Sequence, residues 1–286
     1  MDLKINRQKR IAAINDFSGF GRCSLTVSIP IISAMGIQCC AVPTAVLSNH
    51  TGYEDYFFDD YTDKMPYYYS KWEKLHLEFD GIYTGFLGSE RQVDIVSDFI
   101  SRFADAGTRV IVDPAMGDDG RTYATMTPGL CKSITRLVRH SDILTPNLTE
   151  ACILTGMPYS EALTDTGSLL TICHKLAALG GKDIVITGIH LGKDIGNFIY
   201  NRDGSCQMYT TPLLGSRRAG TGDVFASVIA ADAVNHVPFA DSVKAAALFV
   251  SKSIEASDAL QIPSEDGICF ELFLNDLTTH FVDGEK

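Results

Sequence analysis

Two glycines and an acid stand together in the run Ala219-Gly220-Thr221-Gly222-Asp223, directly before a long stretch of small and apolar residues. Backbone N–H groups at the start of a helix have no partner within the helix and bind anions. Glycines let a phosphate approach that backbone without a Cβ in the way. The pattern therefore indicates either an anion-binding turn with an acid beside it, or an acid that complements the helix dipole, with Thr221 or Gly222 as the cap.

A second group of acids, Asp113, Asp118 and Asp119, begins where a predicted buried strand ends and continues through a loop with Gly117 and Gly120. Carboxylate oxygens are the ligands that Mg²⁺ prefers, directly or through water. Asp, Gly and Pro are also the usual residues of a solvated turn, so the spacing alone supports either interpretation. The glycines and paired acids further favour a mobile loop, extending from residue 113 to 123.

Asn147 and Glu150 stand three residues apart at a predicted helix start, in the run TPNLTE of residues 145–150. This spacing is typical of a capping box, in which each side chain binds the backbone N–H of the other residue. It also suits a metal site, because a glutamate in that turn would face the ends of the strands. The two roles are compatible.

His50 lies in the loop SNHTGY of residues 48–53, which follows the second predicted strand and is either a structural loop or part of a site. The seven histidines and eight cysteines include no C-x-x-C pair and no spacing typical of zinc. Most cysteines have apolar neighbours, as buried free thiols do, and this favours a reducing compartment.

One glycine pattern points to a different class of protein. Residues 19–24, GFGRCS, follow a predicted strand and resemble a dinucleotide-binding turn. That fingerprint also needs an acidic residue near the end of the second strand, where this chain has Cys39-Cys40-Ala41-Val42. An NAD-dependent oxidoreductase, which would bind a nicotinamide cofactor and need no ATP, is therefore the different-class alternative. A phosphate-binding P-loop sequence, GxxxxGK followed by Ser or Thr, is absent.

The bulk composition argues against nucleic acid and membrane as partners. The chain has 286 residues and a net charge of −11, and its basic residues are dispersed apart from Lys4, Arg7, Lys9 and Arg10. An acidic body repels phosphate backbones, so this basic cluster is interpreted as a solvated tail. We see no signal peptide and no apolar run of about 20 residues, so a cytoplasmic protein is expected.

Strands and helices are expected to alternate along one domain, residues 1–286. Strands are predicted at 10–15, 37–42, 80–86, 109–113, 142–145, 183–187, 196–201 and 205–210. Helices are predicted at 24–35, 62–75, 89–106, 128–140, 148–156, 165–179, 222–235, 239–257 and 265–280. Alternation indicates an α/β fold with a mostly parallel sheet covered on both faces. The last two strands flank Arg202-Asp203-Gly204 and predict an antiparallel edge hairpin.

In this order the motifs together resemble pyridoxal kinases of the ribokinase-like superfamily, from about Ile11 to Ser257. The resemblance is carried by NDFSG at 15–19, SNHTGY at 48–53, YTGFLGS at 83–89, VDPAMG at 112–117, TPNLTE at 145–150 and GTGD at 220–223. It implies a three-layer α/β/α sandwich and ATP- and Mg²⁺-dependent phosphorylation of the 5′-hydroxymethyl group of pyridoxal, pyridoxine or pyridoxamine. A monovalent cation is a further candidate cofactor, and a homodimer is the implied assembly.

The resemblance also implies a role for individual residues. Asp223 is the base beside the anion hole of Gly220, Thr221 and Gly222. Asp113 and Glu150 hold Mg²⁺, partly through water. The nucleotide is bound by Asp118, Tyr123, Thr145, Asn147, Thr187 and Gly188. The substrate pocket is lined by Asp16, Ser18, Thr44, His50 and Phe86.

Two alternatives lie within the same fold. Many pyridoxal kinases have Ser where this chain has Asp16, and residues 15–19 look more like hydroxymethylpyrimidine kinases of thiamine synthesis. Those kinases often carry Cys at the position of Asp223, and they lack the SNHTGY loop, so the B6 vitamers are favoured as substrates. A non-catalytic ligand-binding relative is the other alternative, but a pure binder has no need of a base beside an anion hole.

Overall fold

The computed structural model describes residues 8–215 and 217–281, arranged around one nine-stranded sheet with the order β11-β10-β9-β8-β5-β4-β1-β2-β3. A separate two-stranded hairpin, β6–β7, projects from a loop. The strands are β1 (Arg10–Phe20), β2 (Gln38–Asn49), β3 (Phe58–Asp60), β4 (Gly81–Thr84), β5 (Arg109–Val112), β6 (Gly117–Asp118), β7 (Arg121–Thr122), β8 (Ile143–Leu144), β9 (Asp183–Leu191), β10 (Asp194–Tyr200) and β11 (Cys206–Pro212).

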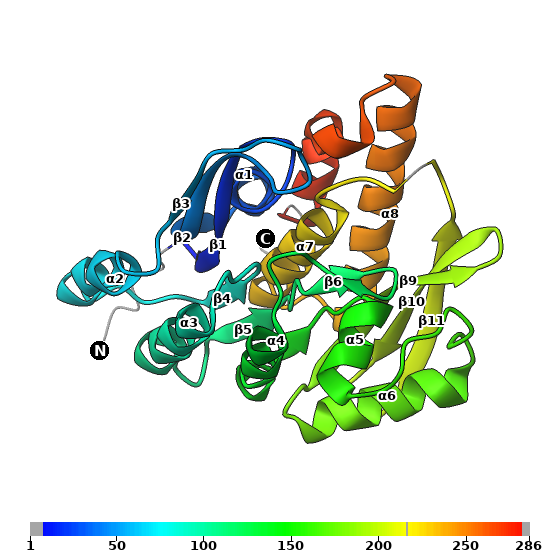
Figure 1. Ribbon diagram of the computed structural model, residues 1–286, viewed down its shortest axis with the longest axis horizontal. Coiled ribbons are helices and arrows are strands. Elements are labelled where there is room, and N and C mark those ends of the chain that lie inside the picture. Colours follow the sequence, from blue (N-terminus) through cyan, green and yellow to red (C-terminus); the bar gives the residue numbers. More distant parts are fainter. Residues whose placement is uncertain (1–7, 216, 282–286) are drawn as a thin grey trace.

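Helices cover both faces of the sheet, so the predicted three-layer ribokinase-like sandwich is confirmed (Figure 1). They are α1 (Leu25–Ala34), α2 (Met65–Lys74), α3 (Glu90–Phe103), α4 (Pro128–Thr135), η1 (Val138–His140), α5 (Leu148–Thr155), α6 (Thr166–Ala178), α7 (Thr221–Val234), α8 (Phe239–Ala259), η2 (Ser264–Asp266) and η3 (Phe270–Phe281). One apolar core packs α1, α7, α8 and η3 against the sheet, and a second core packs α2 to α6 against the other face.

The edges of the sheet are antiparallel and its centre is parallel. The predicted hairpin is confirmed, since β10 pairs with β11 antiparallel. The antiparallel part extends further than predicted, because β9 also pairs with β10 across a tight turn at Gly192 and Lys193. At the opposite edge, β3 pairs with β2 antiparallel, a short strand that the sequence pattern did not predict.

Several predicted boundaries were wrong near the polar motifs. The first two strands continue to Phe20 and Asn49, past the points where polar side chains suggested that they would stop. They continue because they pair in parallel with each other, with a bulge between Asn15 and Phe17 that absorbs the irregularity. The predicted helix 265–280 is instead two 3₁₀ segments, η2 and η3, separated by extended chain.

Side-chain caps explain why three helices begin where they do. Ser89, Thr127 and Asp165 each accept a hydrogen bond from the backbone N–H three residues later, at the starts of α3, α4 and α6. Helix α7 begins differently. Its N-cap is Gly220 with φ 72°, and no side chain caps it. Its first N–H groups therefore stay available to a ligand.

The order of the strands indicates a ligand site at the carboxyl end of β1. Strand β1 lies between β4 and β2, and successive connections run in opposite directions from it. In open α/β sheets, ligands bind where the strand order reverses in this way. Among the described residues, the model contains no helix long and apolar enough to cross a membrane.

Candidate active site

The carboxylate of Asp223 lies in the first turn of α7, beside the end of β1. Asn15 donates a hydrogen bond from Nδ2 to its Oδ1 at 3.0 Å, and the backbone N–H of Ser24 donates to the same carboxylate. Burial raises the pKa of Asp223 to about 6, the nearby charge of Asp16 adds to that rise, and the two hydrogen bonds oppose it. A carboxylate with this pKa is ionised at neutral pH and is a better proton acceptor than an exposed aspartate.

Asn15 connects Asp223 to β1 and to the loop that follows β4. Its side chain is fully buried, and its Oδ1 accepts hydrogen bonds from the backbone N–H groups of Asp16 at 3.0 Å and Phe86 at 2.9 Å. A Cβ at Gly85 would lie 2.3 Å from the Asn15 amide nitrogen, so this glycine leaves room for the amide. Sequence reasoning quoted Asn15 within a motif and assigned it no role. The available signal was a polar residue inside an otherwise apolar buried strand.

Asp16 is a second buried carboxylate close to the first. It accepts hydrogen bonds from the hydroxyl groups of Ser18 at 2.8 Å and Ser24 at 2.6 Å. Burial raises its pKa, and the hydrogen bonds from these two hydroxyls lower it. Ser24 thus serves both acids, and it does so with φ 56°, a left-handed conformation that non-glycine residues seldom adopt.

The two glycines at the start of α7 have different surroundings. A Cβ at Gly220 would lie 1.7 Å from the carbonyl oxygen of Arg22, so the turn packs directly against the loop after β1. A Cβ at Gly222 would meet nothing within 4 Å. The open space beside Gly222 adjoins Asp223, and this is the arrangement that an incoming phosphoryl group needs.

Glu150 forms the predicted capping box with Asn147 at the start of α5. Its oxygens also accept from backbone N–H groups of the loop after β5, at Met116 (2.9 Å) and at Gly117. Burial raises the pKa of Glu150 to about 7, although these N–H groups lower it. The carboxylate is therefore already hydrogen-bonded, and contact with a metal through water fits it better than direct ligation.

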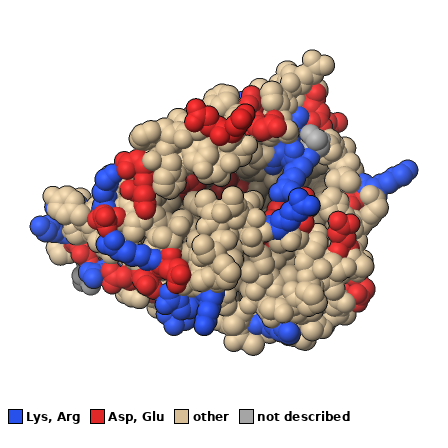
Figure 2. All heavy atoms as spheres, viewed as in Figure 1, with Lys and Arg blue, Asp and Glu red and all other residues tan. Residues whose placement is uncertain are grey.

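Asp113, at the end of β5, completes an acidic group with Glu150 and Asp223. Burial and the charges of those two acids raise the pKa of Asp113 well above its usual range. None of these three acids, nor Asp16, belongs to an ion pair among the described residues. Figure 2 shows a face that is hollowed near its centre, with acidic atoms inside the hollow.

This donor set fits Mg²⁺ bound mainly through phosphate and water. Mg²⁺ prefers carboxylate oxygens and usually keeps several waters beside substrate phosphates. Within residues 8–215 and 217–281, no three Asp, Glu, His or Cys side chains converge closely enough to hold a metal by themselves. A cation would also relieve the repulsion between Asp113 and Glu150, neither of which has an ion-pair partner in the part of the chain that the structure describes.

The hairpin β6–β7 forms one wall of the predicted nucleotide site. Arg217 pairs with Asp118 at 2.7 Å and with Asp119 at 2.5 Å, and so ties the hairpin to the loop before α7. Sequence reasoning missed Arg217, because its partners lie about a hundred positions away. A cavity of about 530 Å³ is lined there by Asp118, Asp119, Arg121, Thr122, Tyr123, Glu161 and Arg217.

The other predicted nucleotide residues lie at neighbouring strand ends. Thr145 follows β8 and is buried, and Thr187 bridges to Asn147 beside it. The predicted end of the strand at Thr187 was wrong. Strand β9 continues past this residue through an irregularity in its pairing with β10, and Gly188 adopts φ 71° facing open space.

The predicted substrate residues fall into two groups. Thr44 donates from its hydroxyl to the carbonyl of Phe86 at 3.2 Å, close to Asn15, while Asp16 and Ser18 bond to each other. His50 is engaged elsewhere. Its Nε2 lies 2.7 Å from the carbonyl oxygen of Glu265, and its Nδ1 accepts from the N–H of Gly52 at 3.1 Å. Both contacts together require the neutral Nε2–H tautomer.

The fold and this site define a ribokinase-like phosphotransferase. The chain belongs to the phosphomethylpyrimidine kinase family, whose model matches residues 29–268. This finding agrees with the resemblance to pyridoxal kinases, because relatives of both activities match the chain.

Solved structures resemble the chain over nearly its whole length. A protein from Bacteroides thetaiotaomicron, assigned as a phosphomethylpyrimidine kinase, is 38% identical, with a TM-score of 0.93 and 96% of each chain covered. Another crystal form of it was solved with pyridoxal. Pyridoxal kinase from Lactobacillus plantarum is 26% identical, with a TM-score of 0.87, 96% of this chain and 97% of that chain covered.

Among proteins compared by sequence, the hydroxymethylpyrimidine/phosphomethylpyrimidine kinase of Rhizobium meliloti is 23% identical over 85% of this chain and 89% of its own length. The comparisons thus support a kinase. The relatives include both pyridoxal kinases and hydroxymethylpyrimidine/phosphomethylpyrimidine kinases.

Proposed function

We propose that this protein is a vitamin B6 kinase, which transfers the γ-phosphoryl group of ATP to the 5′-hydroxymethyl group of pyridoxal, pyridoxine or pyridoxamine. The observation that carries the proposal is the carboxylate of Asp223 beside the anion-binding turn, held by Asn15 and Ser24. Pyrimidine kinases of the same fold often have Cys at that position. The relative from Bacteroides thetaiotaomicron solved with pyridoxal further supports the assignment.

The residues of the site account for each part of such a transfer. Asp223 orients the substrate hydroxyl and takes its proton as the new oxygen–phosphorus bond forms. The bond from the γ-phosphorus to its bridging oxygen breaks, and ADP leaves with that electron pair. N–H groups at Gly220 to Gly222 stabilise the charge on the equatorial phosphoryl oxygens. Bound Mg²⁺, near Asp113 and Glu150, would neutralise phosphate charge.

A pyrimidine kinase is the second candidate, and Asp16 is the observation that favours it. This buried acid is bound by Ser18 and Ser24, in the part of the chain that looks more like hydroxymethylpyrimidine kinases. The family description and the Rhizobium meliloti relative point the same way. Asp223 would perform the same chemistry on either acceptor, so the choice of substrate must be tested directly.

The test is ADP release by the purified protein with Mg-ATP and, separately, each B6 vitamer and hydroxymethylpyrimidine. We expect kcat/KM for one B6 vitamer to exceed that for the pyrimidine by at least about tenfold, which is about 1.4 kcal/mol of discrimination. A preference for the pyrimidine would overturn the proposed substrate and leave the phosphoryl-transfer assignment intact.

Asp16→Ser gives the assay an internal control, since Ser is the residue that many pyridoxal kinases carry there. If the chain is a B6 kinase, this variant should keep most of its vitamer activity and lose any activity on the pyrimidine. The matched variant Asp16→Asn retains the size of the side chain, so it separates the effect of charge from the effect of shape.

A further inference from the structure

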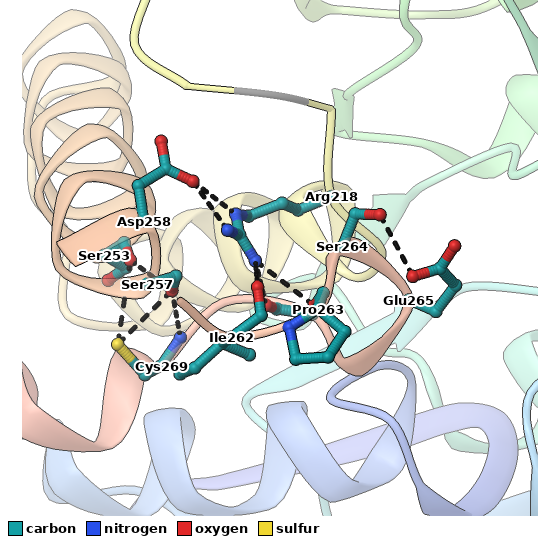
Figure 3. A network of polar contacts seen from close by, with 10 residues as sticks. Arg218, Ser253, Ser257, Asp258, Ile262, Pro263, Ser264, Glu265 and Cys269 are labelled. Carbon is teal, nitrogen blue, oxygen red and sulfur yellow. Dashed lines mark hydrogen bonds and ion pairs between the residues drawn. The ribbon is translucent and has the colours of Figure 1, made fainter. Parts of the chain in front are cut away.

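Arg218 is a buried cation that lies two residues before the anion-binding turn (Figure 3). Its side chain is 4% exposed, and it pairs with Asp258 of α8 through Nη2 at 2.5 Å and Nε at 3.1 Å. Its Nη1 points to main-chain carbonyl oxygens of the segment that follows α8, at Ile262 (2.8 Å), Pro263 (3.2 Å) and Gly267 (3.4 Å).

Residues 262–267, which we call the clamp segment, also contact the other loops of the site. The N–H of Ala219 donates to the carbonyl of Ser264, and the N–H of Arg22 donates to the carbonyl of Asp266, both at 3.2 Å. On the substrate side, His50 contacts the carbonyl of Glu265 at 2.7 Å. The hydroxyl of Tyr53 likewise donates to Asp266 at 2.7 Å. The clamp segment therefore joins the anion-binding turn, the loop after β1 and the loop after β2.

The guanidinium group of Arg218 suits this position because of its shape. It offers five N–H donors in a planar fork, and here they reach a carboxylate on one side and carbonyls on the other. A buried charge without such partners would cost several kcal/mol, so these contacts keep the side chain in one conformation. A lysine in the same place could supply the charge and fewer of the contacts.

The packing around Gly220 makes the turn sensitive to small movements of this cation. Gly220 is in the left-handed conformation and lies against the carbonyl of Arg22, so the turn has no free space behind it. The other side of the turn is held through Arg218 and Ala219 on the clamp segment. A shift of about 1 Å at a reacting centre can lower a rate about 100-fold.

We propose that Arg218 is a positioning residue for phosphoryl transfer, which acts by holding the anion-binding turn against the clamp segment. Its side chain binds Asp258 and the clamp segment, so it would act through the turn and not on the acceptor. The inference rests on the proposed role of Gly220 to Gly222 in binding the transferring phosphoryl group. It does not depend on whether a B6 vitamer or a pyrimidine is the acceptor.

The experiment compares Arg218→Ala with the wild type, using whichever acceptor the wild type phosphorylates. We expect kcat to fall about 100-fold, and KM for the acceptor to change by less than about threefold, because the loss falls on the transition state. Arg202→Ala is the matched control. Arg202 pairs with Asp183 at 2.5 Å, at the first residue of β9. This ion pair belongs to no part of the candidate site, so removing the Arg202 side chain should leave kcat unchanged.

Chemical rescue separates positioning from a general loss of folding. Guanidinium chloride at about 20 mM, well below denaturing concentrations, should raise kcat of the Arg218→Ala enzyme at least about tenfold. The added guanidinium ion would refill the space beside Asp258. Tetramethylammonium chloride at the same ionic strength is the control salt and should restore nothing, because it has no N–H donors. Equal effects of the two salts would overturn the proposal, as would an Arg218→Ala enzyme with wild-type kcat.

If Arg218→Ala does not fold, Asp258→Asn and Arg218→Lys provide the test. Each keeps the site filled and removes part of the fork contact, so kcat should fall in both while circular dichroism stays near that of the wild type. The melting temperature of Asp258→Asn should also fall, because the buried Arg218 charge loses its carboxylate partner. Wild-type kcat in both folded variants would overturn the proposal. A wild-type enzyme that phosphorylates only the pyrimidine would refute the B6 assignment and still allow this comparison.

Discussion

At the scale of single residues, Asp223 combines two properties that oppose each other. Burial raises its pKa to about 6, which makes it a useful proton acceptor. The same burial makes its ionised form unfavourable in the folded protein. Asn15 and Ser24 reduce that cost by hydrogen bonding to the carboxylate. The site thus holds a charge that the fold by itself would disfavour.

Asp223→Asn should lower kcat by about 10²- to 10⁴-fold while ATP still binds, because the amide cannot take the proton. The measurements are ADP release and calorimetric titration with a non-hydrolysable Mg-ATP analogue. Asp241→Asn, an exposed acid at the start of α8, is the matched control and should be fully active. A fully active Asp223→Asn enzyme would remove Asp223 as the base.

The same variant should be more stable than the wild type at high pH. The folded pKa of Asp223 lies above the unfolded value of 3.8, so the folded state binds this proton more tightly. That favourable contribution is complete below about pH 4 and is lost as pH rises through about 6. Above that range the charge costs the fold about 1–3 kcal/mol. Thermal melting should therefore favour Asp223→Asn at pH 8 and show little difference near pH 4.

The activity itself should rise with pH through the same group. If ionised Asp223 is the base, kcat/KM should increase to a plateau with a midpoint near pH 6. In Asn15→Ala, a hydrogen bond that lowers the pKa is lost, so the midpoint should move to higher pH. Titration of the substrates affects both enzymes equally. The difference between their two midpoints therefore reports a change in the protein. An unchanged midpoint would contradict the role given to Asn15.

At the scale of secondary-structure elements, the start of α7 depends on two glycines for different reasons. Position 220 needs glycine because its backbone is left-handed and because a Cβ there would collide with the Arg22 carbonyl oxygen. Position 222 needs glycine because a Cβ would project into the open space beside it. Gly220→Ala should therefore lower the melting temperature or prevent folding. Gly222→Ala should fold normally and lose activity, since its Cβ would enter the space for the phosphoryl group. Equal melting temperatures for both variants would contradict this distinction.

The hairpin β6–β7 is the element that we expect to close over the nucleotide. Arg217 holds it through two partly exposed ion pairs, each worth about 0.2–1 kcal/mol. Tryptic cleavage after Arg121 should become slower when Mg-ATP is bound. In Arg217→Gln the nucleotide-free enzyme should be cleaved several-fold faster, as followed by mass spectrometry. Arg91→Gln, at another exposed pair, is the control, and equal cleavage with and without ATP would contradict closure.

At the scale of the whole molecule, one sheet brings every part of the site to the same edge. Asp16 lies within β1, Asp113 follows β5 and Glu150 follows β8, and α7 directs its N-terminus toward them (Figure 1). The predicted homodimer remains a prediction at this scale. Phe57 and Phe58, next to and within the edge strand β3, are 65% and 44% exposed and are candidates for its interface.

Light scattering after gel filtration should give twice the chain mass of 31.2 kDa. Phe57→Asp should shift the protein toward monomer if that edge is the interface, because a buried unpaired charge is costly. Tyr67→Asp, at another exposed aromatic residue on α2, is the control and should leave the mass unchanged. A monomeric wild type would overturn the dimer.

Local patterns in the sequence determined the order of helices and strands, the capping box of Asn147 and Glu150, and the turn before Asp223. Each of these depends on residues within a few positions of one another, where helix and strand periodicity act. The extra length of β1 and β2 was not predictable in this way, because it comes from their pairing. The C-terminal 3₁₀ segments were missed for the same reason, since their path follows tertiary contacts.

Only the tertiary structure decided which distant side chains hold the site together. Asn15 meets Asp223 across 208 positions, Arg217 meets Asp119 across 98, and Arg218 reaches the clamp segment across more than 40. No short-range spacing records such pairs, because their energy arises only after folding has removed the groups from water. The sequence thus supplied the candidate residues for the chemistry as predictions, whereas the residues that position them became visible only in the tertiary packing.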